Sequence, residues 1–348
     1  MSNTAATPDH DLDIARLEPW LAKNVDGFGT IDEVVKFPGG QSNPTYKIVS
    51  GDNSYVLRRK PFGPLLPSAH AVDREYKLIS ALHPTGFPVA RPYALCEDDS
   101  VIGAMFYVMG FVGGRTIVDG QIPGVDNADR RVMYENLIKV LAQLHNTDYE
   151  AAGLSEYGKP GNYFVRQVGR WTKQYRGAQT DDIPEVEKLI AFLPETVPQQ
   201  DRSSVIHGDY RIDNVMYAPD SPKIVAVLDW ELSTIGDPLA DFTYLAMHWS
   251  MPNQGNAGLM DVDLETLNIP TLEQAVELYC AETGRSGVPD LNWYFAYNLF
   301  RLVGIVQGIK KRVLNGNASS AKAEAAAARV VPLAQASWEF ARRAGAPA

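Results

Sequence analysis

Two short motifs combine carboxylate and amide side chains in a way that suits metal-dependent chemistry. The first, HGDYRIDN at residues 207–214, places His207, Asp209 and Asn214 in a polar loop directly after an apolar run. The second, VLDW at residues 227–230, places Asp229 at the end of the next apolar run. Carboxylate and amide oxygens are hard ligands of the kind that Mg²⁺ uses together with substrate phosphates. We therefore expect these side chains to meet at one rim and to bind a metal ion.

The spacing within the first motif indicates phosphoryl transfer. This reaction needs an aspartate that accepts the proton of the attacking hydroxyl group, and an asparagine and a second aspartate that hold the metal. In the kinase catalytic loop H-R-D-x-x-x-x-N the asparagine follows the aspartate by five residues. Asn214 follows Asp209 by the same five residues. A competing P-loop interpretation of GLSEYGKP at 153–160 fails, because Pro160 stands where a metal-binding hydroxyl is needed.

Hydropathy patterns predict the elements that must position these motifs. A helical stripe at 11–24 precedes three β-rich runs between residues 31 and 57, which the turn clusters GGQSN and SGDNS separate. A helix is expected at 71–82, and two more strands around 90–99 and 105–112. Helices then dominate, at 128–146, 291–314 and 318–344, the last with a kink near Pro332. The strand-loop-strand segment 203–231 interrupts them, and 251–261 is the best candidate for a flexible loop.

Composition excludes several other classes of protein. A chain of 348 residues predicts about two domains or lobes, and a formal net charge of −10 disfavours nucleic acid as a partner. Cys96 and Cys280 are too few for a disulfide framework or a four-cysteine zinc site. Neither a signal-peptide pattern nor an apolar run of about 18 residues is present. We expect a cytoplasmic protein with no membrane partner.

Taken together, the motifs resemble those of a known family. HGDYRIDN, VLDWE and GDPLADF, preceded by GGQSNPTY, YVLRRKP and SAHAVDREYKLI, resemble the aminoglycoside phosphotransferase family of kinase-like enzymes, which is related to choline kinases. The sequence is most similar to the subgroup that resembles the kinase domain fused to acyl-CoA dehydrogenases. The resemblance implies an α+β, protein kinase-like fold of two lobes. Residues 1–109 would form a small antiparallel sheet with one helix that binds nucleotide, and residues 110–348 a larger, mostly helical lobe for catalysis and substrate binding.

The resemblance also implies roles for individual residues. Asp209 would be the catalytic base, Arg211 would neutralise the γ-phosphate of ATP or GTP, and Asn214 and Asp229 would hold Mg²⁺. A phosphate-covering turn, a strand cation with its ion-pair partner on the next helix, and a hinge would bind the nucleotide through Gly39, Gly40, Ser42, Asn43, Arg58, Glu75, Met109 and Phe111. Structural support of the site would come from His207, Asp237 and Asp241.

The sequence departs from protein kinases at several of these positions. The G-x-G-x-x-G pattern is replaced by GGQSNPTY, and Arg58 stands in place of a lysine. If the strand register slips, Arg59 or Lys60 would take the place of Arg58. These departures, together with the missing D-F-G and A-P-E signatures, count against a protein kinase.

The phosphate acceptor stays open at this level. The subgroup points to a small-molecule alcohol such as a 4-hydroxyacyl-CoA, with an aminoglycoside-type antibiotic kinase or a nucleotide-binding pseudokinase scaffold as alternatives. The stripe of Tyr294, Asn298 and Arg301 could face an acceptor, and core packing is an equal interpretation. Basic residues at 310–312 could meet CoA phosphates, or could simply suit a helix C-terminus. A homodimer also stays open.

Overall fold

The computed structural model describes residues 11–38, 43–63, 70–317 and 321–347. It divides the chain into two compact units, each built from separate segments of the sequence. The first unit contains Met1–Thr116, Glu150–Tyr157 and Asn214–Ser233, and the second contains Ile117–Tyr149, Gly158–Asp213 and Thr234–Ala348. This division differs from the expected single boundary between residues 109 and 110, because a later hairpin pairs with a strand of the first unit.

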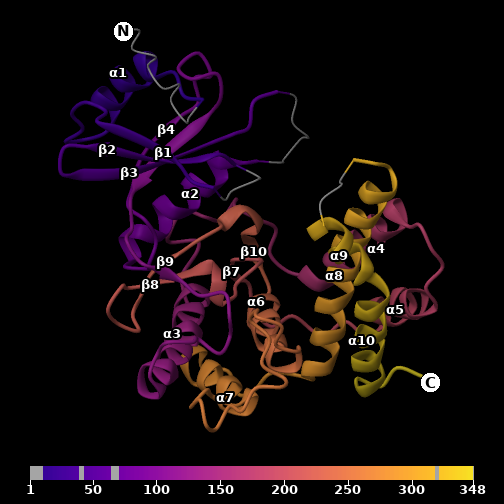
Figure 1. Ribbon diagram of the computed structural model, residues 1–348. Coiled ribbons are helices and arrows are strands. Elements are labelled where there is room, and N and C mark those ends of the chain that lie inside the picture. Colours follow the sequence, from indigo (N-terminus) through magenta and orange to yellow (C-terminus); the bar gives the residue numbers. More distant parts are fainter. Residues whose placement is uncertain (1–10, 39–42, 64–69, 318–320, 348) are drawn as a thin grey trace. The chain divides into compact units, whose positions relative to one another are not determined.

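An antiparallel sheet of five strands dominates the first unit (Figure 1), in the order β1-β2-β3-β5-β4. The strands are β1 (Glu33–Lys36), β2 (Thr45–Ser50), β3 (Asn53–Arg59), β4 (Pro92–Cys96) and β5 (Phe106–Gly110). In β2, residues alternate between buried and half-buried, so Tyr46 and Ile48 face the core. The predicted strands therefore form, and tertiary pairing orders them.

Two helices accompany this sheet. α1 (Ile14–Asn24) starts where the Asp13 side chain accepts the Arg16 N–H at 3.3 Å, and it buries Leu17 and Leu21 in the core cluster. α2 (Val72–Leu82) is the helix predicted between the strands, and the one-turn η1 (His83–Thr85) follows it. The α+β pattern expected for this part of the chain is therefore present.

A second, three-stranded sheet completes the first unit. β6 (Arg115–Thr116) pairs with β8 (Val215–Tyr217), which pairs with β9 (Ile224–Val227), and the one-turn η3 (Trp230–Leu232) follows. The N–H of Val227 donates to the carbonyl of Pro88 at 2.8 Å, and the ring of Trp230 meets that of Phe87 edge to face. These contacts explain why residues near 220 belong to the same unit as residues more than a hundred positions earlier in the chain.

Helices make up most of the second unit. Their bounds are α3 (Asn127–His145), α4 (Tyr163–Ala178), α5 (Pro184–Glu195), α6 (Leu239–Ala246), α7 (Leu272–Thr283), α8 (Leu291–Leu314), α9 (Ala321–Ala328) and α10 (Val330–Arg343), with the short turns η2 (Ile212–Asn214) and η4 (Met247–Ser250). β7 (Ser204–Ile206) and β10 (Thr234–Gly236) form a two-stranded antiparallel sheet. α8 contacts α4, α6, α9 and α10 (Figure 1). A Cβ at Gly304 of α8 would lie 3.3 Å from the Trp171 ring, so glycine allows the close approach of α4.

Two local expectations need comment. The break in the last helical segment falls at Arg329, so the predicted kink near Pro332 is misplaced, and Pro332 lies in the first turn of α10, where a missing N–H costs no hydrogen bond. The segment 251–261 has no helix or strand, as expected. Its Asn253 side chain donates to Asp119, and the Gly120 N–H donates to the Asn256 carbonyl at 2.9 Å.

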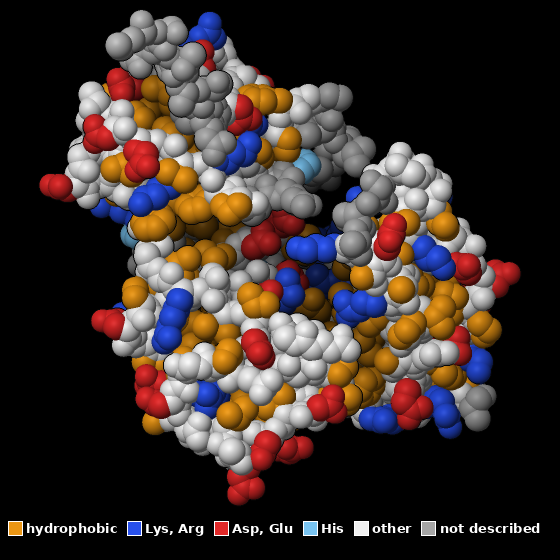
Figure 2. Space-filling model, viewed as in Figure 1, with side chains coloured by type: hydrophobic (Ala, Val, Ile, Leu, Met, Phe, Trp, Pro, Cys, Tyr) orange, Lys and Arg blue, Asp and Glu red, His pale blue; other side chains and the backbone are white. Residues whose placement is uncertain are grey.

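The surface has mixed charge. On the face seen in Figure 2, acidic and basic side chains are interspersed with apolar ones. Within the part of the chain that the structure describes, no helix combines the length and apolar character needed to cross a membrane.

Candidate active site

Side chains hold the backbone around Asp209 in the second unit. Asp241, on α6 and 1% exposed, accepts the N–H of His207 at 2.5 Å and that of Gly208 at 2.7 Å. Nδ1 of the buried His207 accepts the N–H of Asp209 at 3.2 Å. The backbone N–H groups of three consecutive residues after β7 therefore donate to side chains, and not to water or to a neighbouring strand. His207 and Asp241 lie where the resemblance places structural support.

Asp241 is itself held by α3. The Nε2 atom of His145 lies 3.5 Å from its carboxylate, and the His145 Nδ1 is 2.8 Å from the hydroxyl of Tyr279. Burial opposes the charge of Asp241, but the hydrogen bond from His145 and the amides of the loop hold its pKa below the ordinary value. Burial lowers the pKa of His145. A buried carboxylate that receives several donors stays ionised and fixes their positions.

Asp209 itself is partly open to solvent. Its side chain is 21% exposed, and the Nε atom of Arg211 lies 3.6 Å from Oδ2. Arg211 also approaches Asp213, with 3.2 Å between Nη1 and Oδ2. On the inner side lies Tyr244, where burial, followed by the charge of Asp209, raises the pKa of the tyrosine to about 12. A carboxylate with a cation beside it can accept a proton from an alcohol while the cation meets developing negative charge.

The sequence analysis missed Tyr244. It follows Asp241 by three residues in α6, so both side chains lie on one face of that helix. This spacing is the one signal that could have pointed to it.

Asp237 is the other residue expected to give the site structural support. Its carboxylate accepts the N–H of Leu239 at 2.9 Å and so supports the start of α6. Burial raises its pKa to about 6.

Glu75 on α2 centres a buried polar cluster in the first unit. It is 3% exposed and accepts from Asn43 Nδ2 and from the Tyr107 hydroxyl, each at 3.1 Å. The Nε of Arg58 lies 2.9 Å from Oε2, although its N–H is not aligned for a hydrogen bond. Burial raises the pKa of Glu75 in spite of Arg58. The ion pair that the resemblance implies between strand and helix is therefore present.

The structure also selects among the basic residues at the end of β3. Arg58 and Arg59 are neighbours in a strand, so their side chains leave opposite faces of the sheet. Arg59 is buried against Tyr46, pairs with Asp11, and its guanidinium lies 3.8 Å from the ring centroid of Phe62. Only Arg58 faces Glu75, so the alternative register in which Arg59 would replace it does not occur.

Arg58 also approaches the proposed metal ligands. Its Nη2 lies 3.6 Å from Oδ1 of Asp229, whose side chain is 43% exposed. Asp229 has left-handed backbone angles, φ 62° and ψ 61°, which are costly for a residue with a Cβ and cluster at functional sites. The Leu228 N–H donates to the Asn214 carbonyl at 2.8 Å. The two candidate ligands therefore flank the paired strands: Asn214 directly precedes β8, and Asp229 lies two residues after β9.

This donor set fits a hard divalent cation. It offers a carboxylate and an amide next to the paired ends of β8 and β9, beside Arg58, which faces both Glu75 and Asp229. Mg²⁺ takes one or two protein oxygen ligands and completes its shell with phosphates and water. Among the described residues, no group of three or more His, Cys, Asp or Glu side chains is suited to hold a metal.

Other predicted nucleotide contacts have mixed outcomes. Gly39, Gly40 and Ser42 lie outside the described residues. Met109 is in β5 and pairs with Val56, and the N–H of Phe111 donates to the Ser54 carbonyl at 3.1 Å. The Phe111 N–H, which a hinge would offer to the nucleotide base, therefore donates to β3 instead. The ring of Phe111 is 40% exposed.

The stripe proposed on α8 does not face an acceptor. Tyr294 and Asn298 are 1% and 0% exposed, and Asn298 donates to the Thr243 hydroxyl at 3.2 Å. Arg301 is also buried and donates to the carbonyl of Gly208 at 2.6 Å. The polar residues of this helix face α6 and the loop because α8 is a core helix, so the core-packing interpretation holds.

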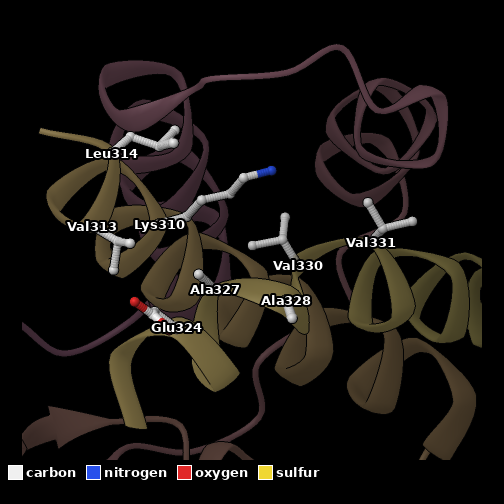
Figure 3. Close-up of a pocket in the computed structure, with 8 residues that line it drawn as sticks. All are labelled: Lys310, Val313, Leu314, Glu324, Ala327, Ala328, Val330 and Val331. Atoms are coloured by element: carbon white, nitrogen blue, oxygen red, sulfur yellow. The ribbon is translucent and has the colours of Figure 1, made fainter. Parts of the chain in front are cut away.

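Lys310 and Lys311, two of the three basic residues at the end of α8, have protein partners. Lys310 lies 2.5 Å from Asp181, and Lys311 donates to the Gly177 carbonyl at 2.8 Å. Figure 3 shows Lys310 among mainly apolar side chains of α8, α9 and α10, around a pocket of about 250 Å³. Basic residues suit a helix C-terminus, so the position of Lys310 and Lys311 is explained without CoA phosphates.

The fold of the two units and the loop around Asp209 define the class of a kinase-like phosphotransferase. The chain belongs to the phosphotransferase enzyme family, whose model matches residues 33–273. It is 46% identical to a putative aminoglycoside phosphotransferase from Ralstonia eutropha, with a TM-score of 0.89 over 95% of this chain and 99% of that one. The α+β, protein kinase-like fold class is thereby confirmed.

Curated relatives are longer proteins. The chain is 42% identical over 90% of its length to acyl-CoA dehydrogenase family member 10 of Mus musculus, of which it covers 30%. It is 39% identical over 97% of its length to acyl-CoA dehydrogenase family member 11 of Homo sapiens, of which it covers 44%. The chain therefore spans less than half the length of these relatives.

More distant solved structures share the fold. A thermostable mutant of an aminoglycoside phosphotransferase, in a ternary complex with AMP-PNP and hygromycin B, is 15% identical with a TM-score of 0.59, over 95% of this chain and 99% of that one. A macrolide 2′-phosphotransferase from Brachybacterium faecium is 20% identical with a TM-score of 0.58, over 90% of this chain and 97% of that one.

Proposed function

We propose that this phosphotransferase moves the γ-phosphate of ATP or GTP to a hydroxyl group of a small molecule, with Asp209 as the base. The observation that carries the proposal is the backbone around Asp209, in which Asp241 and His207 accept three consecutive amides. A base must be held in a defined direction to take a proton during the transfer, and fixed side chains achieve this without reorganisation.

Other residues of the site would bind the phosphates and the metal ion. Arg211, beside Asp209, meets negative charge on the phosphoryl group. Arg58 is held by Glu75 and offers the rest of its guanidinium to the nucleotide phosphates. Asn214 and Asp229 are the residues that would hold Mg²⁺, which when bound would neutralise the phosphate oxygens. Asp209 takes the proton that the alcohol loses as its oxygen bonds to phosphorus and the nucleoside diphosphate leaves.

The preferred acceptor is a 4-hydroxyacyl-CoA or a related metabolite alcohol. Relatives at about 40% identity are named as acyl-CoA dehydrogenase family members, which favours an acyl-CoA. The antibiotic-modifying structures are similar only at 14–20% identity, so they support an antibiotic substrate less strongly. The description of the Ralstonia eutropha neighbour keeps the antibiotic alternative in the test. A pseudokinase is disfavoured because Asp209, Asn214 and Asp229 are all present.

Acceptor-stimulated nucleotide consumption tests the proposal. Release of ADP or GDP is measured with Mg²⁺ and 4-hydroxyacyl-CoAs, aminoglycosides or choline-like alcohols, for the unmodified chain and for Asp209→Asn. The matched control is Asp263→Asn, which changes an exposed carboxylate that also accepts a backbone N–H, at 3.0 Å from Thr266. We expect one acceptor class to stimulate turnover, which Asp209→Asn lowers by about 1000-fold or more and the control leaves unchanged.

Three results would each contradict part of the proposal. Undiminished turnover in Asp209→Asn removes Asp209 as the base. Nucleotide binding without transfer to any alcohol, or to water, favours the pseudokinase. Stimulation by aminoglycosides alone keeps the chemistry and overturns the acyl-CoA preference.

A further inference from the structure

Arg301 is a buried cation whose position needs a reason. Its side chain lies in the core helix α8, and the residue is 9% exposed. Burial opposes the charge of the Arg301 guanidinium, whereas Tyr297, Tyr244 and Asp209 favour that charge and raise its pKa. Burying a guanidinium is unfavourable unless its surroundings compensate, so the contacts of Arg301 must stabilise the charge.

Two contacts of Arg301 lead to the Asp209 loop, one to Gly208 and one to Tyr244 beside Asp209. Nη2 donates to the carbonyl oxygen of Gly208 at 2.6 Å. The guanidinium lies 5.0 Å from the ring centroid of Tyr244 and 5.8 Å from that of Trp171, within the range of cation–π attraction. Tyr244 in turn lies beside the Asp209 carboxylate. The cation is therefore stabilised by one carbonyl and two aromatic faces.

The Gly208 carbonyl belongs to the peptide plane that directly precedes the Cα atom of Asp209. This plane joins Gly208 to Asp209, and its N–H end, on Asp209, is accepted by Nδ1 of His207. A peptide unit is rigid, so holding both its C=O and its N–H fixes its orientation. Gly208 has a φ of +86°, which residues with a Cβ rarely adopt and which glycine allows without strain.

We propose that Arg301 is a positioning residue: by binding the Gly208 carbonyl it holds the peptide plane from which the Asp209 side chain leaves, and so aims the base. The proposal rests on the proposed function of Asp209. His207 holds the opposite end of the same plane, and Asp241 holds the two amides before it. Arg301 does not touch the substrate and acts through Asp209.

A double-mutant cycle tests this role, because a residue that acts only through Asp209 loses its effect once Asp209 is changed. The readout is basal ADP release from MgATP with water as the acceptor, which needs no knowledge of the natural alcohol. We expect Arg301→Met to lower the rate about 10- to 100-fold in the unmodified chain and less than about 2-fold in the Asp209→Asn background. Nucleotide affinity should stay unchanged in both.

Two further variants separate positioning from general stability. Arg301→Lys keeps the charge and a donor, so it should fold and retain more activity than Arg301→Met, and the cycle is run with it as well. Arg130→Met removes another buried arginine, which donates to the carbonyls of Val125 at 2.6 Å and Leu267 at 3.0 Å. We expect this control to lower the unfolding midpoint and to leave basal ADP release unchanged.

A direct measurement of the loop accompanies the kinetics. Hydrogen exchange at the Asp209 amide should quicken in Arg301→Met and stay unchanged in Arg130→Met, because only the first releases the peptide plane. Equal losses of rate in both backgrounds, or full activity in Arg301→Met, would overturn the positioning role. If instead Asp209→Asn retains full basal activity, Asp209 is not the base. The hydrogen-exchange result still shows whether Arg301 holds the Gly208–Asp209 peptide plane.

Discussion

Removing the carboxylate of Asp241 should strongly destabilise the second unit. Asp241 is 1% exposed and accepts the N–H groups of His207 and Gly208 at 2.5 and 2.7 Å. Each hydrogen bond to a buried charged group contributes about 1.5–3 kcal/mol, so Asp241→Ala, which leaves both donors unsatisfied, should cost about 3–6 kcal/mol. This is a large fraction of a typical stability of about 5–15 kcal/mol.

The amide variant gives a finer test of the same reasoning. In Asp241→Asn the side-chain oxygen can still accept one N–H, while the new NH₂ group opposes the other, so about half of that cost is expected. Catalysis should fall at least about 10-fold in both variants, because the peptide planes before Asp209 lose their anchor.

The assay is urea unfolding followed by tryptophan fluorescence, with activity measured in parallel. Asp263→Ala serves as the matched control, since its exposed carboxylate accepts the Thr266 N–H at 3.0 Å. We expect that control to cost no more than about 1 kcal/mol. A loss below about 1 kcal/mol for Asp241→Ala, equal to the control, would refute the claim that this carboxylate holds the loop.

Three further predictions concern charged groups of both units. Burial raises the pKa of Asp237 from 3.8 to about 6, so the native state loses stability as pH rises between these values. Asp237→Asn should therefore stabilise the protein by up to about 3 kcal/mol at pH 7 and not at pH 4. A gain in stability that is independent of pH would contradict this prediction. Asp229→Gly should relieve about 1 kcal/mol of left-handed backbone strain while Mg²⁺-dependent turnover is lost, and a clear loss of stability in urea would count against it. Arg58→Met, which leaves the carboxylate of Glu75 buried and unpaired, should cost about 3–5 kcal/mol in urea, and adding Glu75→Gln should restore most of it; a double variant no more stable than the single one would show that the pair is not coupled.

Local patterns of the sequence predicted the elements well. The helix predicted at 291–314 matches α8, and the β-rich run between the turn clusters GGQSN and SGDNS matches β2. These predictions succeed because hydrophobic periodicity reports which side of an element is buried, whatever it packs against. The predicted kink near Pro332 was misplaced because a proline in the first turn of a helix looks the same in sequence as one that kinks a helix.

The candidate site was only partly predictable. The five-residue spacing from Asp209 to Asn214 indicated phosphoryl transfer, and the resemblance added the pair of Arg58 with Glu75. That Arg58 faces Glu75 while Arg59 leaves the opposite face depends on strand register. Register comes from pairing with β2 and β5, which no short motif specifies.

By itself, the sequence indicated the candidate site residues and their spacing, and its resemblance named the family to which the chain belongs. Only the tertiary structure decided what holds Asp209. Arg301 reaches Gly208 across 93 residues of chain, and Asp241 reaches His207 across 34. The physical reason is that motif spacing and periodicity are local properties of a chain, whereas the partner of a buried charge is chosen by the packing of distant helices around it.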